Sequence, residues 1–208
     1  MNKNQPIITI GRQTGSNGRE IGLRLAKKLG IPFYDRELIT EAAKESGLDE
    51  KVIENSEEKP IGSLIYSLYM GAVPYGAGTA SSGDLPLDQK VFIAQFEAIK
   101  RIAAEGPCVI VGRCADYALA GNPALFSIFI LADETDRIRV VMDELGFSES
   151  KARDYITKRD KKRASYYNFN TDKKWGAAST YDLCLNSSAF GVDGSVELLA
   201  AAIEAHRS

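Results

Sequence analysis

The sequence predicts an α/β domain in which a parallel sheet is flanked by helices on both faces. Short runs of consecutive apolar residues, typical of strands buried on both faces, alternate with longer segments that have helical spacing. A glycine-rich turn joins the first of these runs to the first helical segment. Because parallel strands are usually joined by crossover helices, the alternation favours one parallel sheet of four or five strands.

The expected strands are short and apolar, and helices separate them. The strands are expected at residues 7–10, 33–34, 107–113, 126–132 and 183–185. The helices are expected at residues 19–29, about 36–45, about 49–57, 88–104, from near 148 onward, and 196–205. Residues 60–70 have apolar positions at helical spacing, and the glycine- and proline-rich residues 71–87 predict a flexible loop.

The composition predicts a single domain with an ordinary surface. The 208 residues carry a formal net charge of −2, which argues against nucleic-acid binding through bulk charge. The three cysteines lack C-x-x-C spacing and the chain has one histidine, so no zinc site is expected. No apolar run approaches the roughly 20 residues of a membrane helix. We expect a soluble, cytoplasmic protein without a nucleic-acid or membrane partner, and its oligomeric state is left open.

The turn after the first strand has the layout of a phosphate-binding loop. Residues 15–18, Gly-Ser-Asn-Gly, let backbone N–H groups approach an anion, and the following helix adds the positive end of its dipole. A simple tight turn is the alternative interpretation. The candidate nucleotide-binding residues are Gly15, Ser16, Asn17, Gly18, Arg19 and Glu20.

The usual G-x-x-x-x-G-K-[ST] spacing is absent, because Arg19-Glu20 stands where a Lys-Ser or Lys-Thr pair would follow. A cation at a helix start opposes the helix dipole, so Arg19 is better explained by an anion bound there. Arg12, just before the turn, is either a second such charge or simply exposed.

Residues 158–163, Lys-Arg-Asp-Lys-Lys-Arg, form the most basic segment of the chain. On a helix, Arg159 and Arg163 are four residues apart and share one face, with Asp160 within reach of Arg163. The segment is either a solvated charged face or an anion clamp that closes over phosphates, a role that suits arginine's planar fork. The phosphate loop in the same chain favours the clamp.

Three further residues are candidates for substrate contact. Arg113 ends an apolar strand, at the edge where open α/β sheets bind ligands, and a surface salt bridge is its alternative role. Asp35 and Arg36 follow the second strand and form either a local surface pair or part of a substrate site.

These motifs resemble those of the cytidylate kinases, in particular the cytidylate kinase-like proteins, over nearly the whole chain. The matching segments are residues 8–10 with Gly15-Ser16, residues 24–30, residues 33–35, Gly112-Arg113, the R-D-x-x-R-A pattern of residues 159–164, and residues 185–188. The resemblance implies the P-loop fold of nucleoside monophosphate kinases, with a five-stranded parallel sheet. It implies a core of residues 1–45, 100–150 and 181–208, a monophosphate-binding subdomain at about 46–99, and a lid at about 157–180.

The chain departs from the cytidylate kinases at the phosphate loop. In the gap-free register their lysine falls on Gly18 and their serine or threonine on Arg19. That lysine compensates charge on the donor phosphates, and the hydroxyl helps to hold Mg²⁺. Arg19, one residue later, is a candidate replacement for the charge. Thr14 and Ser16 are nearby hydroxyls, but no residue clearly replaces the metal ligand.

The resemblance implies a phosphotransferase that moves the γ-phosphoryl of ATP, with Mg²⁺, onto a nucleoside monophosphate or another small acceptor. It implies catalytic roles for Arg19, Arg159, Lys162 and Arg163. It implies acceptor binding by Asp35, Arg36, Arg113, Asp160 and Arg163. Because the Lys-[ST] pair is missing, a non-catalytic module that binds a nucleotide or another anion is the alternative.

Overall fold

A computed structural model describes residues 6–35 and 87–206 of the protein. The helices expected within residues 36–70, nearly all of the glycine-rich loop, most of the implied monophosphate-binding subdomain, and Arg36 lie outside the described residues. Within the described residues, no helix is long and apolar enough to cross a membrane.

Five strands form one parallel sheet, as the alternating pattern predicts. Its order is β2-β3-β1-β4-β5, so the first strand lies in the centre and pairs with both β3 and β4. The strands are β1 (Ile7–Arg12), β2 (Phe33–Tyr34), β3 (Cys108–Val111), β4 (Leu125–Leu131) and β5 (Leu183–Asn186). The structure extends the first strand by two residues, to Arg12, which places this arginine at the carboxyl edge of the sheet.

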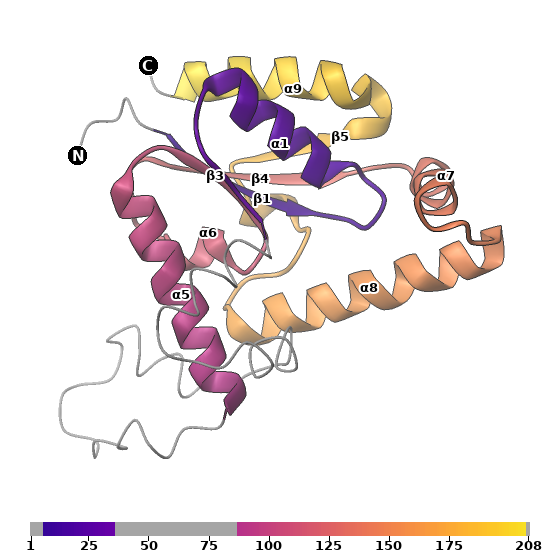
Figure 1. The fold of residues 1–208 in the computed structure, drawn as a ribbon, viewed down its shortest axis with the longest axis horizontal. Coiled ribbons are helices and arrows are strands. Elements are labelled where there is room, and N and C mark those ends of the chain that lie inside the picture. The colour runs from indigo at the N-terminus through magenta and orange to yellow at the C-terminus, as the bar shows by residue number, and fades with distance from the viewer. Residues whose placement is uncertain (1–5, 36–86, 207–208) are drawn as a thin grey trace.

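Helices cover both faces of the sheet (Figure 1). Helices α1 (Gly18–Leu29) and α9 (Ser187–His206) pack together on one face, and α5 (Leu87–Glu105), α6 (Ala115–Ala118) and α8 (Glu149–Asn170) lie on the other. Helix α7 (Glu134–Leu145) follows β4 and packs against α8 at one end of the molecule. Gly191 interrupts the helical conformation of α9 near its start.

The two faces of each central strand belong to two separate cores. Ile8 and Ile10 of β1 face α1 and α9, whereas Ile7 lies among the side chains of α5, α6 and α8. Strand β3 divides in the same way, with Val109 on one side and Ile110 on the other. Because alternate residues all meet apolar neighbours, these strands are apolar at every position, which explains the uninterrupted runs in the sequence.

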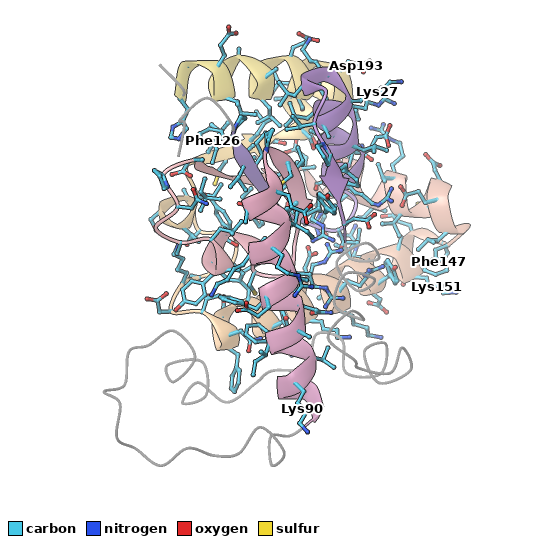
Figure 2. All side chains as sticks on the ribbon, turned by 60° about the vertical axis from the view of Figure 1, so that its left-hand side comes forward. Lys27, Lys90, Phe126, Phe147, Lys151 and Asp193 are labelled. Atoms are coloured by element: carbon cyan, nitrogen blue, oxygen red, sulfur yellow. The ribbon has the colours of Figure 1, made fainter. Side chains whose placement is uncertain are left out.

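The corner between α7 and α8 is fixed by local contacts. The Ser148 hydroxyl accepts a hydrogen bond from the Lys151 amide (3.4 Å), which confirms the expected helix start. The Lys151 ammonium lies 3.9 Å from the centre of the Phe147 ring, and the two labelled side chains lie together in Figure 2. From this corner α8 continues without a break to Asn170, so the basic segment 158–163 is helical.

Candidate functional site

The loop between β1 and α1 has a backbone that glycine and asparagine permit. Gly15 has φ +77° and Asn17, which precedes the helix, has φ +56°. A Cβ on Gly15 would lie 2.5 Å from the carbonyl oxygen of Arg137, so only glycine fits against α7. The Ser187 hydroxyl donates to the Ser16 carbonyl (2.9 Å), which ties the loop to the end of β5. The loop is therefore held by elements that are distant in the sequence.

Several residues of the loop line a cavity at the start of α1 and have backbone amides without a recorded acceptor. The Thr14 amide donates to Asp160 Oδ1 (2.9 Å), and the Ser16 amide donates to the Gln13 carbonyl (3.4 Å). Within the described part of the chain, no acceptor is recorded for the amides of Gly15, Asn17, Gly18 and Arg19. Unsatisfied amides at a helix start, together with the helix dipole, favour an anion at this place.

We call this cavity, which is lined by the loop residues at the start of α1, the donor cavity. Its volume is about 410 Å³, within the range of small-ligand sites. It lies between the loop, Asp35 after β2, and side chains of α7 and α8. Four arginines and three carboxylates line it, and the arginines are Arg12, Arg19, Arg159 and Arg163. The cationic lining and the exposed amides suit a phosphorylated ligand.

Arg19 forms an ion pair with Asp35 across the mouth of the donor cavity. Its Nε and Nη2 atoms both donate to Asp35 Oδ2, at 2.9 and 2.6 Å. The Arg19 side chain is 58% exposed, and that of Asp35 is 9% exposed. This pair differs from the predicted pair of Asp35 with Arg36, which stays a prediction because Arg36 lies outside the described residues. A role of Arg19 toward donor phosphates stays a prediction.

Helix α8 binds directly to the phosphate loop through Asp160. Its Oδ1 accepts from both the amide and the hydroxyl of Thr14, at 2.9 and 2.8 Å, and its Oδ2 pairs with Arg137. Arg137 Nε also donates to the Thr14 carbonyl (2.8 Å). Arg163 Nη1 donates to the Thr14 hydroxyl (3.1 Å) and to the Arg12 carbonyl (3.3 Å). The amide, hydroxyl and carbonyl of Thr14 are thus all bonded to α7 or α8.

The structure separates the predicted clamp residues. Arg159 lines the donor cavity and donates a hydrogen bond to Tyr155. Lys162 is exposed and lines neither the donor cavity nor the second cavity described below. Arg137, which the sequence analysis missed, is buried between the loop and α8. Arg137 lies in the first turn of α7, the helix that follows β4. This position could have marked it as a candidate, because ligands bind at the carboxyl edge of open α/β sheets.

A second, smaller cavity of about 40 Å³ lies at the carboxyl ends of β1 and β3. Arg113 lines it and is 8% exposed, so the surface salt bridge considered for this residue does not describe it. The turn that carries Arg113 has positive φ at three successive residues, +84° at Gly112, +58° at Arg113 and +54° at Cys114. Such conformations are uncommon outside glycine and accumulate at functional sites.

A buried carboxylate shares this second cavity. Asp116 on α6 lines it, and the Tyr167 hydroxyl donates to Asp116 Oδ2 (2.5 Å). Burial raises the pKa of Asp116, and the hydrogen bond from Tyr167 opposes that rise. The Thr9 hydroxyl, 2% exposed, also lines the cavity and has no hydrogen-bond partner among the described residues. A water molecule or a polar group of a ligand would satisfy it, and the cavity has room for either.

The donor cavity and the second cavity adjoin each other. Arg12 and Arg163 line both of them, and no other residue does so among those described. Two ligands, one in each cavity, would therefore meet beside these two guanidinium groups.

Comparison with known proteins agrees with this geometry. Residues 7–189 match the model of the cytidylate kinase-like family. The chain belongs to this family. The cytidylate kinase of Methanopyrus kandleri is 27% identical, with 95% of this chain and 93% of that protein covered.

Solved structures share the fold of this chain. An uncharacterized protein from Eubacterium ventriosum is 31% identical and has a TM-score of 0.73, with 96% of this chain and 99% of that chain covered. The shikimate kinase of Bacteroides thetaiotaomicron, at 15% identity and a TM-score of 0.55, covers 96% of this chain and 99% of its own and shares the fold alone. The expected P-loop kinase fold is confirmed.

Proposed function

We propose that this cytidylate kinase-like protein transfers the γ-phosphoryl group of ATP to a nucleoside monophosphate or another small phosphorylated or hydroxylated acceptor. One observation carries the proposal: a cationic cavity with exposed loop amides adjoins a second polar cavity, and two arginines line both. Phosphoryl transfer needs little covalent chemistry from the protein, because positioning and charge neutralisation supply most of the rate. The arrangement offers both.

The donor cavity holds the phosphates of ATP in this proposal. The amides of Gly15, Asn17, Gly18 and Arg19 bind the anionic oxygens at the start of α1. Arg159 and Arg163 approach from α8. Arg19 adds a positive charge at the exposed rim while it stays paired with Asp35. Lys162, exposed on α8, attracts the nucleotide through longer-range charge.

The donor cavity also fits Mg²⁺. This ion is usually bound by one or two carboxylates together with substrate phosphates and water. Asp35, the buried carboxylate of the lining, would hold the ion through its carboxylate while Arg19 stays beside it. The hydroxyls of Thr14 and Ser16 already donate to Asp160 and to the Gln13 carbonyl. When bound, Mg²⁺ neutralises charge on the donor phosphates.

The second cavity receives the reacting end of the acceptor. Arg113 supplies a buried cation for an acceptor phosphate, and Asp116 supplies a hydrogen-bond acceptor for a hydroxyl or amino group. Asp160 stays at the loop, where it positions Arg163 rather than the acceptor. In the reaction an acceptor oxygen forms a bond to the γ-phosphorus, the bond between that phosphorus and the β–γ bridging oxygen breaks, and ADP leaves with the electron pair.

A non-catalytic module that binds nucleotide or another anion is the second candidate. Two observations favour it: Gly18 stands where the cytidylate kinases have lysine, and Asp160 already occupies the Thr14 amide. A module of this kind would bind ATP without turning it over.

Two measurements separate the candidates. Calorimetry gives the affinity for ATP with Mg²⁺, and ADP release is followed against a panel of nucleoside monophosphates and small alcohols. ATP binding together with acceptor-dependent ADP release supports the phosphotransferase. ATP binding without release on any acceptor supports the non-catalytic module. A failure to bind ATP contradicts the phosphotransferase and leaves only a module that binds another anion.

A further inference from the structure

The phosphate loop lacks the lysine of the cytidylate kinases, and Arg19, the candidate replacement, is paired with a carboxylate in the structure. Arg19 bonds through two nitrogens to Asp35 at the rim of the donor cavity. A phosphotransferase still needs a cation beside the transferring group, because charge spreads over its oxygens in the transition state. The two arginines that line both cavities are in the right place for this role.

Arg12 occupies the space that a side chain at residue 18 would need. A Cβ on Gly18 would lie 2.6 Å from Arg12 Cβ and 3.1 Å from Arg12 Cγ. Atoms at such distances overlap, so the Arg12 side chain fits in this place only because residue 18 is glycine. The stem of Arg12 runs past the start of α1, where the lysine side chain of the cytidylate kinases would begin.

The guanidinium of Arg12 then reaches the end of β3. A Cβ on Gly112 would lie 2.4 Å from Arg12 Nη1, so a second glycine makes room for the charged end of the side chain. Gly112 precedes Arg113, the buried cation of the second cavity. Two glycines on different elements thus line the path of one arginine from the phosphate loop to the acceptor side.

Arg163 strengthens this placement from α8. Its Nη1 atom donates to the Arg12 carbonyl (3.3 Å) while its side chain lines both cavities. The backbone of Arg12, the last residue of β1, is therefore bonded to the basic helix α8. This bond helps to fix the position from which the Arg12 side chain extends.

We infer that Arg12 is a catalytic residue that replaces the lysine missing from position 18 and donates hydrogen bonds to the transferring phosphoryl group. This inference rests on the proposed function. The guanidinium keeps its protons throughout: it neutralises charge on the γ-phosphoryl oxygens while the bond to ADP breaks and the bond to the acceptor oxygen forms. In this family member, the positive charge beside the transferring group comes from the end of β1 rather than from the start of α1.

The first test removes the charge and keeps the stem. Arg12→Met is expected to lower kcat by about 10³-fold, as loss of an arginine at the transferring group does in other phosphotransferases. The affinity for ATP is expected to fall by roughly tenfold. Arg139→Ala, an exposed arginine of α7, is the matched control and should leave both quantities unchanged. A kcat of Arg12→Met equal to that of the control overturns the inference.

The second test moves the charge back. Gly18→Lys in the natural chain should abolish activity, because the new stem meets Arg12. In the double variant Arg12→Gly with Gly18→Lys, the nearest remaining atom to the new Cβ is Ile130 Cβ at 3.3 Å. We expect the kcat of this double variant to be at least about tenfold higher than that of Arg12→Gly. The effects of the two substitutions would then be non-additive. A double variant no better than Arg12→Gly, in a chain that circular dichroism shows to be folded, contradicts the replacement.

These outcomes are distinguishable from a failure of the proposed function. If the natural chain shows no turnover, the proposed function fails, and inorganic tripolyphosphate then becomes the probe for Arg12. Calorimetry should show roughly tenfold weaker binding to Arg12→Met than to Arg139→Ala. Equal affinities overturn the inference in that case too.

Discussion

Asp160 of α8 accepts hydrogen bonds from the backbone amide and the hydroxyl of Thr14 through a single carboxylate oxygen, although the two residues are 146 positions apart. Its other oxygen pairs with the buried Arg137. An acidic side chain on the basic helix thus binds the same loop that offers amides to an anion. The position of α8 and the conformation of the phosphate loop therefore depend on one carboxylate.

Asp160→Asn is expected to destabilise the protein. The substitution leaves Arg137 buried without its charged partner, which costs about 3 kcal/mol of unfolding free energy. Urea denaturation measures the change. Asp154→Asn, on an exposed position of the same helix, is the control and should change stability by less than about 0.5 kcal/mol. Equal effects of the two variants would show that the contact with Thr14 and Arg137 does not stabilise the fold.

Gly15→Ala should abolish ATP binding, because its Cβ would meet the Arg137 carbonyl oxygen at 2.5 Å. Gly30→Ala is a matched control, since Gly30 has a similar positive φ of +66° but no atom within 4 Å of an added Cβ. The control should lose about 1 kcal/mol of stability from backbone strain alone and keep its ATP affinity. Calorimetry and thermal unfolding check both expectations. A Gly15→Ala variant that binds ATP as well as the control would mean that the loop can move away from α7.

Arg113→Met should weaken acceptor binding without weakening ATP binding, because Arg113 lines only the second cavity. Loss of a charge-assisted contact would raise the KM for a phosphorylated acceptor by roughly 10- to 150-fold. Arg159→Met is the reciprocal control, since Arg159 lines only the donor cavity and should affect ATP instead. Steady-state kinetics with one substrate varied at a time tests the pair. A rise in the KM for ATP alone in Arg113→Met would contradict the assignment of the second cavity to the acceptor.

Stability should fall at alkaline pH because of Cys108. Burial, with a smaller contribution from the charge of Glu105, raises the pKa of its thiol from 9.0 to about 12. Between these values the unfolded chain loses the proton and the native protein keeps it, so the unfolding free energy falls as pH rises, by about 1.4 kcal/mol per pH unit for this group. Cys108→Ala should show a correspondingly shallower fall in urea denaturation from pH 9 to 11.

Val109→Ala is the control for that measurement. It truncates a buried neighbour on the same strand without removing a titrating group, so it should lower stability at every pH and leave the slope as in the natural chain. If the slope of Cys108→Ala equals that of Val109→Ala, the thiol does not account for the alkaline loss of stability.

The strands could be predicted from the sequence because both faces of the sheet are buried. The run Cys108–Val111 is apolar at every position, and few structures other than a covered parallel strand require that. Helix α7 was missed for the opposite reason. Its buried side consists of Arg137, Ile138 and Val141, so a charged residue interrupts the apolar pattern that would have indicated a helix.

The phosphate loop could be located from Gly15 and the neighbouring strand and helix, but its partners could not be predicted. The pairs Arg19–Asp35 and Thr14–Asp160 join residues 16 and 146 positions apart, and no local pattern specifies such contacts. Two roles for Arg12 stay open from the sequence, a second charge toward an anion or simple exposure, because an arginine just before a glycine-rich turn gives the same local signal in both cases. Its close approach to Gly18 exists only in the folded chain.

The central place of β1 in the sheet has a consequence for how ligand binding can be detected. Hydrogen bonds to β3 and β4 hold this strand on both sides, so the phosphate loop begins at a fixed edge of the folded sheet. A ligand that binds this loop in the native protein and not in the unfolded chain raises the free energy of unfolding, and the rise grows with the affinity of the ligand. A thermal shift screen of phosphorylated compounds would consequently rank candidate donors before any reaction has been found for them.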